Sequence, residues 1–429
     1  MHVLFLTFHL PAPDEPGAAR PWAELELMQE LGWQVTVVTA SAHYLTGSIR
    51  HRVRGPWKRT RKDGTTIIRT WSPRDYRRSS WRRLACYLGY SVIAAVAGLT
   101  ARRVDAVFVG TDPPFVTPAA SLLALLHRAA LVVDERDVYP DTALAVGLKP
   151  SRLLVALLSG WNGLLRRQTK SVITVSPGLK ELLLSRGADP QCTFVIPNYF
   201  PSSEASADHV RSNATRPGDA VTVIYAGSLG RATHVSTCID AAELLVRSGS
   251  KNVRFVFLGA GERRQAYAND CQARGLDNVT FPGAIPRDQM ERAFADADIA
   301  LHSFSSHPYW RRALSSKIFE YMSYGLPVVF SGEGDIADLL RESDAGLSSP
   351  PEDAERLAQT TRRLVDDADL RSAMGQRGRR YVSEMFSRAR ARATLARAFG
   401  LEDSEFVAGA ARLPTGRGTT SGHQPTEYY

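Results

Sequence analysis

The chain has 429 residues, enough for two or three domains, and its 44% hydrophobic and 23% charged residues are ordinary for a globular protein. The net charge of +9 suits an anionic partner such as a nucleotide, a phosphate, a membrane surface or a nucleic acid, although an arginine-rich proteome would give the same excess. The four cysteines, at 86, 192, 238 and 271, form no Cys-x-x-Cys pair, which argues against a disulfide framework or a zinc site and fits a reducing compartment.

The N-terminal segment predicts a buried strand. Residues 1–7 have no basic segment and too short an apolar run for a signal peptide, so a cytoplasmic location is expected. Apolar runs of strand length then alternate with helical patterns, at 3–7, 35–39, 106–110, 130–134 and 171–175. Continuous apolar strands separated by helices predict a parallel sheet that is covered on both faces.

The same pattern restarts in the second half of the chain. The strand-like runs there are 221–226, 254–259, 279–281, 299–301 and 328–330. We therefore predict an α/β fold of two doubly wound Rossmann-like lobes with an interdomain cleft, in which ligands bind beyond the carboxyl ends of the strands. The expected divisions are a first lobe at 1–200, a linker at 201–220, a second lobe at 221–385, a helix at 386–400 that packs back on the first lobe, and a disordered tail at 401–429.

One uncharged segment, 84–100, is flanked by pairs of arginines. It has 17 residues, two of them glycines, and so lies at the lower limit for a membrane-spanning helix. A strand pattern follows it directly. We therefore predict a buried or interface-dipping helix in preference to a spanning one.

Two glycine-rich turns follow strands of the second lobe. The first is Tyr-Ala-Gly-Ser-Leu-Gly-Arg at 225–231, and the second is Phe-Leu-Gly-Ala-Gly-Glu at 257–262. Glycines let the backbone approach a phosphate, and a helix N-terminus adds amide donors and positive dipole. A purely structural turn is the alternative. A Rossmann oxidoreductase is disfavoured, because its glycine-rich loop would follow the first strand of the chain and the second turn lacks a third glycine.

The segment 315–330 carries the strongest chemical pattern. Ser315 or Ser316 is a candidate N-cap, Lys317 lies in the first turn of the predicted helix, and Glu320 lies three residues further on the same face. An ammonium group there can join the amides around a phosphate, and a carboxylate can accept hydrogen bonds from two ribose hydroxyls. A solvated Lys–Glu pair is the alternative. Residues 332–335 then form another glycine-rich turn before a helix.

The positive charge gathers in the segment 50–83, which has 13 Lys or Arg against two Asp, with Trp57, Trp71, Tyr76 and Trp81 interleaved. Basic residues with aromatic side chains suit an anionic membrane surface, which would place the protein peripherally on the inner face of the plasma membrane. The same mixture suits single-stranded nucleic acid, and a solvated loop is a further alternative. The adjacent apolar helix favours the membrane, and no nucleic-acid partner is expected.

Taken together, these segments resemble the retaining glycosyltransferase family 4, with the GT-B fold, and most closely bacterial members that build capsule, exopolysaccharide and O-antigen, such as the fucosamine-transferring kind. The resemblance spans about residues 1–400. In the second lobe it rests on 225–230, 257–262, 316–322, 332–335, 374–375 and 379–381. In the first lobe it rests on 134–141, 175–178 and 196–198.

The resemblance implies a retaining transferase that moves a sugar from a nucleotide diphosphate donor, with a UDP-sugar favoured, to a lipid-linked or small-molecule acceptor. No cofactor or metal is expected. Catalytic roles are implied for Asp137, Lys317 and Arg231. Donor binding is implied for Gly227, Ser228, Gly259, Gly261, Glu262, Ile285, Ser316, Glu320, Gly334 and Asp335, and acceptor-side positions for Gly17, Arg20 and Arg136.

Two departures from the family pattern bear on activity. Arg312 stands where many members carry a Glu, eight residues before Glu320, and this removes an expected contact to the sugar hydroxyls. Ser228 and Thr233 stand where many members carry basic residues, which puts more weight on Arg231 and Lys317. A catalytically silent scaffold and a nucleotide-sugar epimerase are the alternatives. The Asp-x-Asp matches at 296–298 and 367–369 lie outside the predicted phosphate turns.

Overall fold

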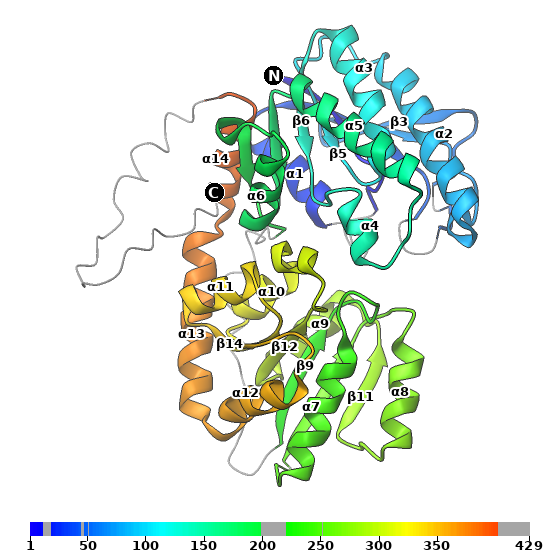
Figure 1. Ribbon diagram of the computed structural model, residues 1–429. Helices are drawn as coiled ribbons and strands as arrows, with labels where there is room; N and C mark the ends of the chain where they lie inside the picture. The colour runs from blue at the N-terminus through cyan, green and yellow to red at the C-terminus, as the bar shows by residue number, and fades with distance from the viewer. Residues whose placement is uncertain (12–18, 44–46, 50, 199–219, 251, 402–429) are drawn as a thin grey trace, which may run out of the picture. The chain divides into compact units, whose positions relative to one another are not determined.

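The computed structural model describes residues 1–11, 19–43, 47–49, 51–198, 220–250 and 252–401, so the predicted linker and tail, apart from residues 220 and 401, lie outside the described residues. The chain divides into two compact units (Figure 1). Unit 1 holds the described residues of Met1–Pro140, Ser151–Ile196 and Arg388–Tyr429, and unit 2 holds those of Asp141–Pro150 and Pro197–Ser387. The segment Asp141–Pro150 thus groups with unit 2, although it precedes residue 200.

Unit 1 is built on an eight-stranded sheet with the order β3-β4-β2-β1-β5-β6-β7-β8. Neighbouring strands are parallel except for the antiparallel hairpin of β3 and β4 at one edge. Every residue of β1 and β5 is buried, as continuous apolar strands require. The strands are β1 His2–Leu6, β2 Gln34–Ala40, β3 Trp57–Lys62, β4 Thr65–Thr70, β5 Ala106–Gly110, β6 Ala130–Asp134, β7 Ser171–Thr174 and β8 Thr193–Val195.

The helices of unit 1 cover this sheet. They are α1 Ala19–Glu30, α2 Ser80–Gly98, α3 Thr117–His127, α5 Arg152–Gln168, α6 Pro177–Ser185 and α14 Arg388–Ala398, with short 3-10 helices at Tyr76–Arg78, Pro114–Val116 and Pro190–Cys192. Helix α14 packs within unit 1, where Ser171 Oγ donates to Ala398 O at 2.5 Å and Arg388 pairs with Glu26 and Glu30. Helix α2 contains the apolar segment discussed above. None of the helices in the described part of the chain has the length and apolar character needed to cross a bilayer.

Unit 2 is built on a six-stranded, entirely parallel sheet with the order β11-β10-β9-β12-β13-β14. Its strands are β9 Val221–Ala226, β10 Val253–Leu258, β11 Val279–Gly283, β12 Ile299–Ser303, β13 Val328–Ser331 and β14 Gly346–Ser349. Its helices are α4 Asp141–Ala145, α7 Val235–Arg247, α8 Arg264–Ala273, α9 Arg287–Ala295, α10 Ser316–Ser323, α11 Asp335–Ser343, α12 Ala354–Asp366 and α13 Ala368–Met385, with a 3-10 helix at Pro308–Arg312. The prediction of two Rossmann-like α/β lobes is confirmed.

Candidate active site

The carboxyl ends of the parallel strands of unit 2 lie at one edge of the sheet, and the predicted glycine-rich turns follow them. The turns after β9 and β10 are joined by their backbones, because Gly227 N–H donates to Leu258 O at 2.9 Å and Leu229 N–H donates to Ala260 O at 3.0 Å. The turn after β9 is also joined to the segment after β12, where Ser305 N–H donates to Ala232 O at 2.9 Å. This edge therefore presents several backbone turns close together.

Two of these glycines are required by close backbone approach. A Cβ on Gly259, whose φ is +139°, would lie 1.8 Å from Gly227 O. A Cβ on Gly334, whose φ is +84°, would lie 1.9 Å from Arg311 O. No larger residue fits either position without moving the neighbouring turn. Glycines at such positions let an anion approach the backbone closely.

Helix α10 begins at the same edge. Ser315 is its N-cap and accepts from the Lys317 N–H at 3.4 Å, so Ser316 takes the first helical position. Tyr321 fixes the helix to β9, because its hydroxyl accepts from Ala226 N–H at 2.7 Å and donates to Ala226 O at 3.1 Å. The first turn of α10 is thus fixed next to the turn that follows β9.

Lys317 and Glu320, the two residues on which the prediction depends most, contact each other. Lys317 Nζ lies 2.7 Å from Glu320 Oε2, and about a third of each side chain is exposed. An i,i+3 pair with this much solvent contributes only about 0.2–0.5 kcal/mol to stability. A ligand can therefore bind both charged groups and break their pairing with little loss of free energy.

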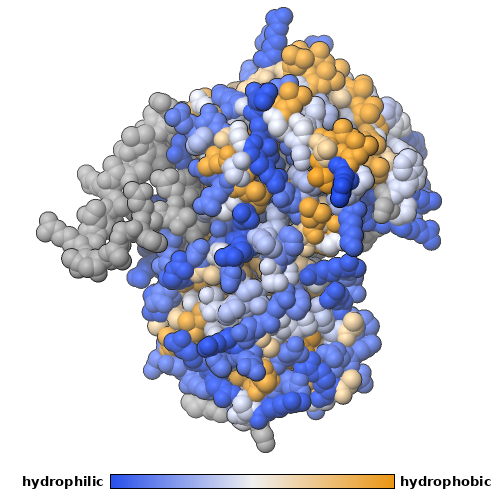
Figure 2. Space-filling view, in the orientation of Figure 1, coloured by the Kyte–Doolittle hydropathy of each residue, from blue (hydrophilic) through white to orange (hydrophobic). Residues whose placement is uncertain are grey.

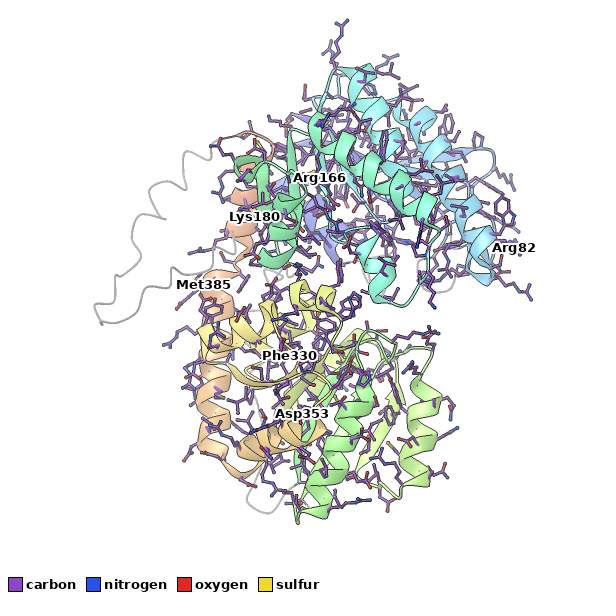
Figure 3. The ribbon with its side chains drawn as sticks, in the orientation of Figure 1. Arg82, Arg166, Lys180, Phe330, Asp353 and Met385 are labelled. Carbon is purple, nitrogen blue, oxygen red and sulfur yellow. The ribbon has the colours of Figure 1, made fainter. Side chains whose placement is uncertain are left out.

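His302, near the carboxyl end of β12, is a site residue that the sequence did not indicate. Its ring stacks on Tyr225 and Phe330 and is buried, and neither ring nitrogen has a hydrogen-bond partner among the described residues. Burial, and then the charge of Lys317, lower the pKa of His302 to about 3. The imidazole is therefore neutral at physiological pH, and the charge of Lys317 at the candidate anion site acts on it. Figure 3 labels Phe330 within this sheet.

The other predicted donor residues occupy the same edge with less definite partners. Arg231 Nε lies 2.8 Å from Glu262 Oε1, and both side chains are more than half exposed. Ser228 and Gly261 are exposed, whereas Ile285 and Ser316 are half-buried. Asp335 is the first residue of α11, whose N-cap, Gly334, has no side chain with which to cap it. An acceptor oxygen in this first turn lies in the favourable field of the helix dipole.

The acidic pairs and Arg312 have structural contacts. Asp298 is buried and accepts from Thr222 N–H at 2.8 Å, and Asp367 caps α13 by accepting from Leu370 N–H at 2.8 Å. Arg312 Nη1 donates to Pro308 O at 3.3 Å within its own 3-10 helix. In the described part of the chain, no cluster of three or more His, Cys, Asp or Glu side chains is arranged to hold a metal ion.

The predicted first-lobe residues form a buried charge network in unit 1. Arg20 is 5% exposed and binds Asp134 through Nε at 3.1 Å and Nη2 at 2.7 Å, while Arg136 Nε lies 3.2 Å from Asp134 Oδ2. Glu24 joins the network at 2.7 Å from Arg20, and burial followed by the charge of Asp134 raises its pKa. Asp137 is half-buried beside this network, and its charge acts on Arg136. Gly17 lies outside the described residues.

The same edge of unit 1 holds a half-buried histidine, His9. His9 follows β1, and burial is the main cause that lowers its pKa to about 4, with Asp112 opposing and Arg136 adding to the shift. The prediction assigned no role to His9. Its only sequence signal is its position just after a buried strand.

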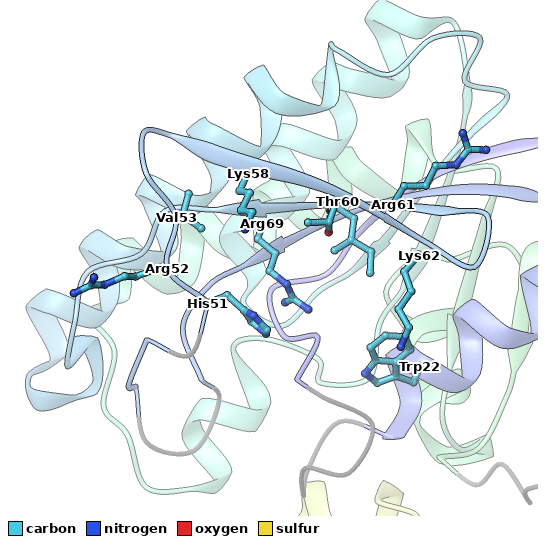
Figure 4. Close-up of a pocket in the computed structure, with 10 residues that line it drawn as sticks. Trp22, His51, Arg52, Val53, Lys58, Thr60, Arg61, Lys62 and Arg69 are labelled. Carbon is cyan, nitrogen blue, oxygen red and sulfur yellow. Dashed lines mark hydrogen bonds between the residues drawn. The ribbon is translucent and has the colours of Figure 1, made fainter.

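A basic concavity of about 650 Å³ lies elsewhere in unit 1, between α1, the β3–β4 hairpin and residues 51–53 (Figure 4). It falls within the basic segment 50–83, apart from Trp22. Its described lining contains no acidic residue and includes Arg52, Lys58, Arg61, Lys62 and Arg69. Arg69 Nη1 donates to Leu10 O at 3.2 Å, which holds its guanidinium near the concavity.

Comparison with known proteins supports this description. Residues 207–381 match the family model of glycosyl transferases group 1, and residues 17–199 match that of a glycosyl transferase 4-like domain. The chain is 23% identical over 289 residues to an Escherichia coli protein named for glycosyl transfer in colanic acid biosynthesis, over 63% of this chain and 69% of that one. It is 30% identical over 155 residues to the alpha-D-kanosaminyltransferase of Streptomyces kanamyceticus, over 36% of this chain and 39% of that one.

Solved structures share the fold. Sucrose-phosphate synthase of Thermosynechococcus elongatus has a TM-score of 0.69 at 16% identity, over 95% of this chain and all of that one. Anabaena HepE in complex with UDP has a TM-score of 0.65 at 16% identity, over 93% of this chain and all of that one. Two Rossmann-like units of this kind define the GT-B class of transferases. The chain belongs to the glycosyltransferases described by the group 1 and 4-like domain models, which between them match most of its length.

Proposed function

We propose that the chain is a retaining glycosyltransferase that takes a sugar from a nucleoside diphosphate donor, with UDP favoured, in bacterial glycan or glycosylated-metabolite biosynthesis. The observation that carries the proposal is the arrangement at the carboxyl edge of unit 2. There the Lys317–Glu320 pair opens α10, and α10 is fixed through Tyr321 to the strand before the 227–231 turn. The names of relatives support it, since they include glycosyl transfer in colanic acid and lipopolysaccharide core biosynthesis, and an aminosugar transferase.

The donor binds along this edge in the following way. The side chains of Lys317 and Arg231 neutralise the diphosphate, and Glu320 accepts from the ribose hydroxyls. The backbone amides at 228, 230 and 231 add donors to the diphosphate. The backbone around Ile285 lies towards the base, and Gly334 and Asp335 receive the sugar. During transfer the bond from the sugar C1 to the diphosphate oxygen breaks and a bond from C1 to the acceptor oxygen forms on the same face. The acceptor hydroxyl gives its proton to the departing diphosphate oxygen on that face, and Lys317 holds the remaining negative charge of the diphosphate.

Donor identity is tested by thermal stabilisation with a panel of nucleotide sugars, because a ligand that binds only the folded state raises its stability. At least one diphosphate sugar should raise the melting temperature. With that donor and an acceptor extract, the anomeric configuration of the product should equal that of the donor by NMR. An inverted product would contradict retention, and the absence of any stabilising donor would contradict the donor site.

A catalytically silent scaffold is the second candidate, because Arg312 replaces the expected carboxylate and is engaged with Pro308 O. This candidate predicts donor binding without turnover by any acceptor. An epimerase would instead consume donor with no acceptor present. Donor-only and donor-plus-acceptor incubations separate both alternatives from a transferase.

The acceptor is proposed to be lipid-linked and reached at an anionic membrane surface through the segment 50–83, on the cytoplasmic side. The basic concavity supports this, and Arg82 projects outward at the N-terminal end of α2 (Figure 3). Each basic residue near such a surface contributes about 1 kcal/mol at low salt. Replacing Arg77, Arg78, Arg82 and Arg83 with Gln should weaken binding to anionic vesicles at low salt and leave donor binding unchanged. Wild-type protein that ignores anionic vesicles at low salt would favour a small soluble acceptor.

A further inference from the structure

Exposed apolar side chains gather on three neighbouring helices of unit 1, α2, α3 and α5. Helix α3 packs against both others, and Trp161 Nε1 of α5 donates to Thr117 Oγ1 of α3 at 2.8 Å. Figure 2 shows the hydrophobic colour over the part of unit 1 where Figure 1 draws these helices. We call this the apolar helix surface; its members are Leu88, Val92, Val96 and Leu99 on and just after α2, Leu122, Leu125 and Leu126 on α3, and Leu153, Leu154, Leu157 and Leu164 on α5.

The spacing makes this a face of each helix rather than scattered residues. On α2 the exposed positions 88, 92 and 96 recur every four residues, while Tyr90, Ala94 and Ala97 face the core. Helix α5 is the extreme case, because Leu165 is the one buried residue among its 17 positions. Leu125 and Leu153 are each at least 70% exposed. Apolar patches of this extent on a folded protein mark a binding surface.

The charges around the surface identify its partner. The sequences of α2, α3 and α5 contain no Asp or Glu. Exposed cations lie at or next to helix ends, namely Arg82, Arg128, Arg152 and Arg167, and the exposed Trp81 lies in the first turn of α2. Leucines bordered by arginines and a tryptophan, without acidic residues, match the interface of an anionic bilayer, where apolar side chains enter the acyl boundary and cations meet the headgroups.

We infer that the apolar helix surface docks in the plane of an anionic bilayer, with α2, α3 and α5 lying in the interface. This adds a hydrophobic anchor to the electrostatic attraction proposed for the segment 50–83, and the two respond differently to salt. Charge attraction is screened as ionic strength rises, whereas burial of apolar surface is not weakened. The inference rests on the proposed function, in which the acceptor is lipid-linked and reached at a membrane. Vesicle binding is measured without donor or acceptor, so a negative result there is distinguishable from a failure of sugar transfer.

The test is sedimentation of the full chain with vesicles of phosphatidylcholine and phosphatidylglycerol, at low salt and at about 1 M NaCl, where the screening length is about 3 Å. Wild-type protein should stay partly bound at high salt. Replacement of Val92, Leu125 and Leu157 by Ser should lower the high-salt partition coefficient by about tenfold or more, since three exposed apolar side chains no longer enter the bilayer. Leu401→Ser, at an exposed leucine off these helices, is the control and should bind as wild type.

Because these three side chains are exposed, the triple variant should keep the wild-type circular dichroism spectrum and melting temperature. Complete release of the wild type by salt would overturn the inference. It would also be overturned if the wild type formed dimers by analytical ultracentrifugation that the triple variant dissolved, because the surface would then bind a second copy. High-salt binding that survives the triple substitution would equally contradict it.

Discussion

Lys317→Ala isolates the charge that is proposed to act on the leaving diphosphate. Lys317 pairs with Glu320 at 2.7 Å, three residues further along the helix, and about a third of each side chain is exposed. Its loss should therefore lower the free energy of unfolding by about 0.2–0.5 kcal/mol, which is too little to lower the melting temperature by more than about 2 °C. Loss of one preorganised contact to developing charge costs about 2–4 kcal/mol in the transition state. The expected result is therefore a fall in kcat of roughly 30-fold to 1000-fold in a folded protein.

The matched control is Arg341→Ala in the same unit. Arg341, in the last turn of α11, forms an i,i+3 pair of the same length with Asp338. Its loss should change stability by a similar small amount and leave turnover unchanged. The assay is nucleoside diphosphate release with the donor found by thermal screening. Near-normal kcat in folded Lys317→Ala protein, or an equal loss in Arg341→Ala, would refute the reasoning.

Three further predictions concern the same unit. Glu320→Gln should weaken UDP binding by about 1.5–3 kcal/mol in calorimetry while pyrophosphate affinity holds, because a charged acceptor for the ribose is lost; unchanged UDP affinity would make Glu320 a surface partner of Lys317. Gly259→Ala should lower the free energy of unfolding by about 2–4 kcal/mol, because the new Cβ would meet Gly227 O. The control is Gly249→Ala, at a position with φ +94° and open space, which should lower it by only about 1 kcal/mol. Equal losses in the two variants would disprove the close approach. His302→Phe should make the free energy of unfolding depend less on pH between pH 7.5 and 5. With a pKa near 3 folded and 6.5 unfolded, neutral His302 makes wild-type stability fall by about 2 kcal/mol from pH 7.5 to 5, and parallel denaturation profiles for the two proteins would contradict this.

Most of the parallel strands were predictable because they are continuous apolar runs, as at 106–110 and 221–226, where every residue is buried. The β3–β4 hairpin was not predicted. Strand β3 has the sequence Trp-Lys-Arg-Thr-Arg-Lys and lies at a sheet edge, where five of its six residues are exposed. Its sequence therefore shows no apolar strand pattern. Strand β14 is only four residues long and gave too little pattern to detect.

Some residues of the candidate site were predictable from the sequence and others were not. Local spacing predicted Lys317 and Glu320 on one face and Ser315 as the cap, because helix geometry fixes neighbours three residues apart. Arg20 and Asp134 are 114 residues apart, so their contact could not be read from spacing, and the fold engages Arg20 in a buried network. His302 gave no signal, since its burial and its lack of hydrogen-bond partners arise only when β9, β12 and β13 come together.

The carboxyl edge of unit 2 is the proposed binding place of the donor diphosphate. Hydrogen exchange of the backbone amides, measured with and without UDP, GDP, ADP and dTDP, tests this directly. At least one nucleoside diphosphate should slow exchange in 227–231, 316–320 and 332–335, and Lys317→Ala should reduce that protection. Protection by none of the four, or protection confined to other segments, would contradict the account.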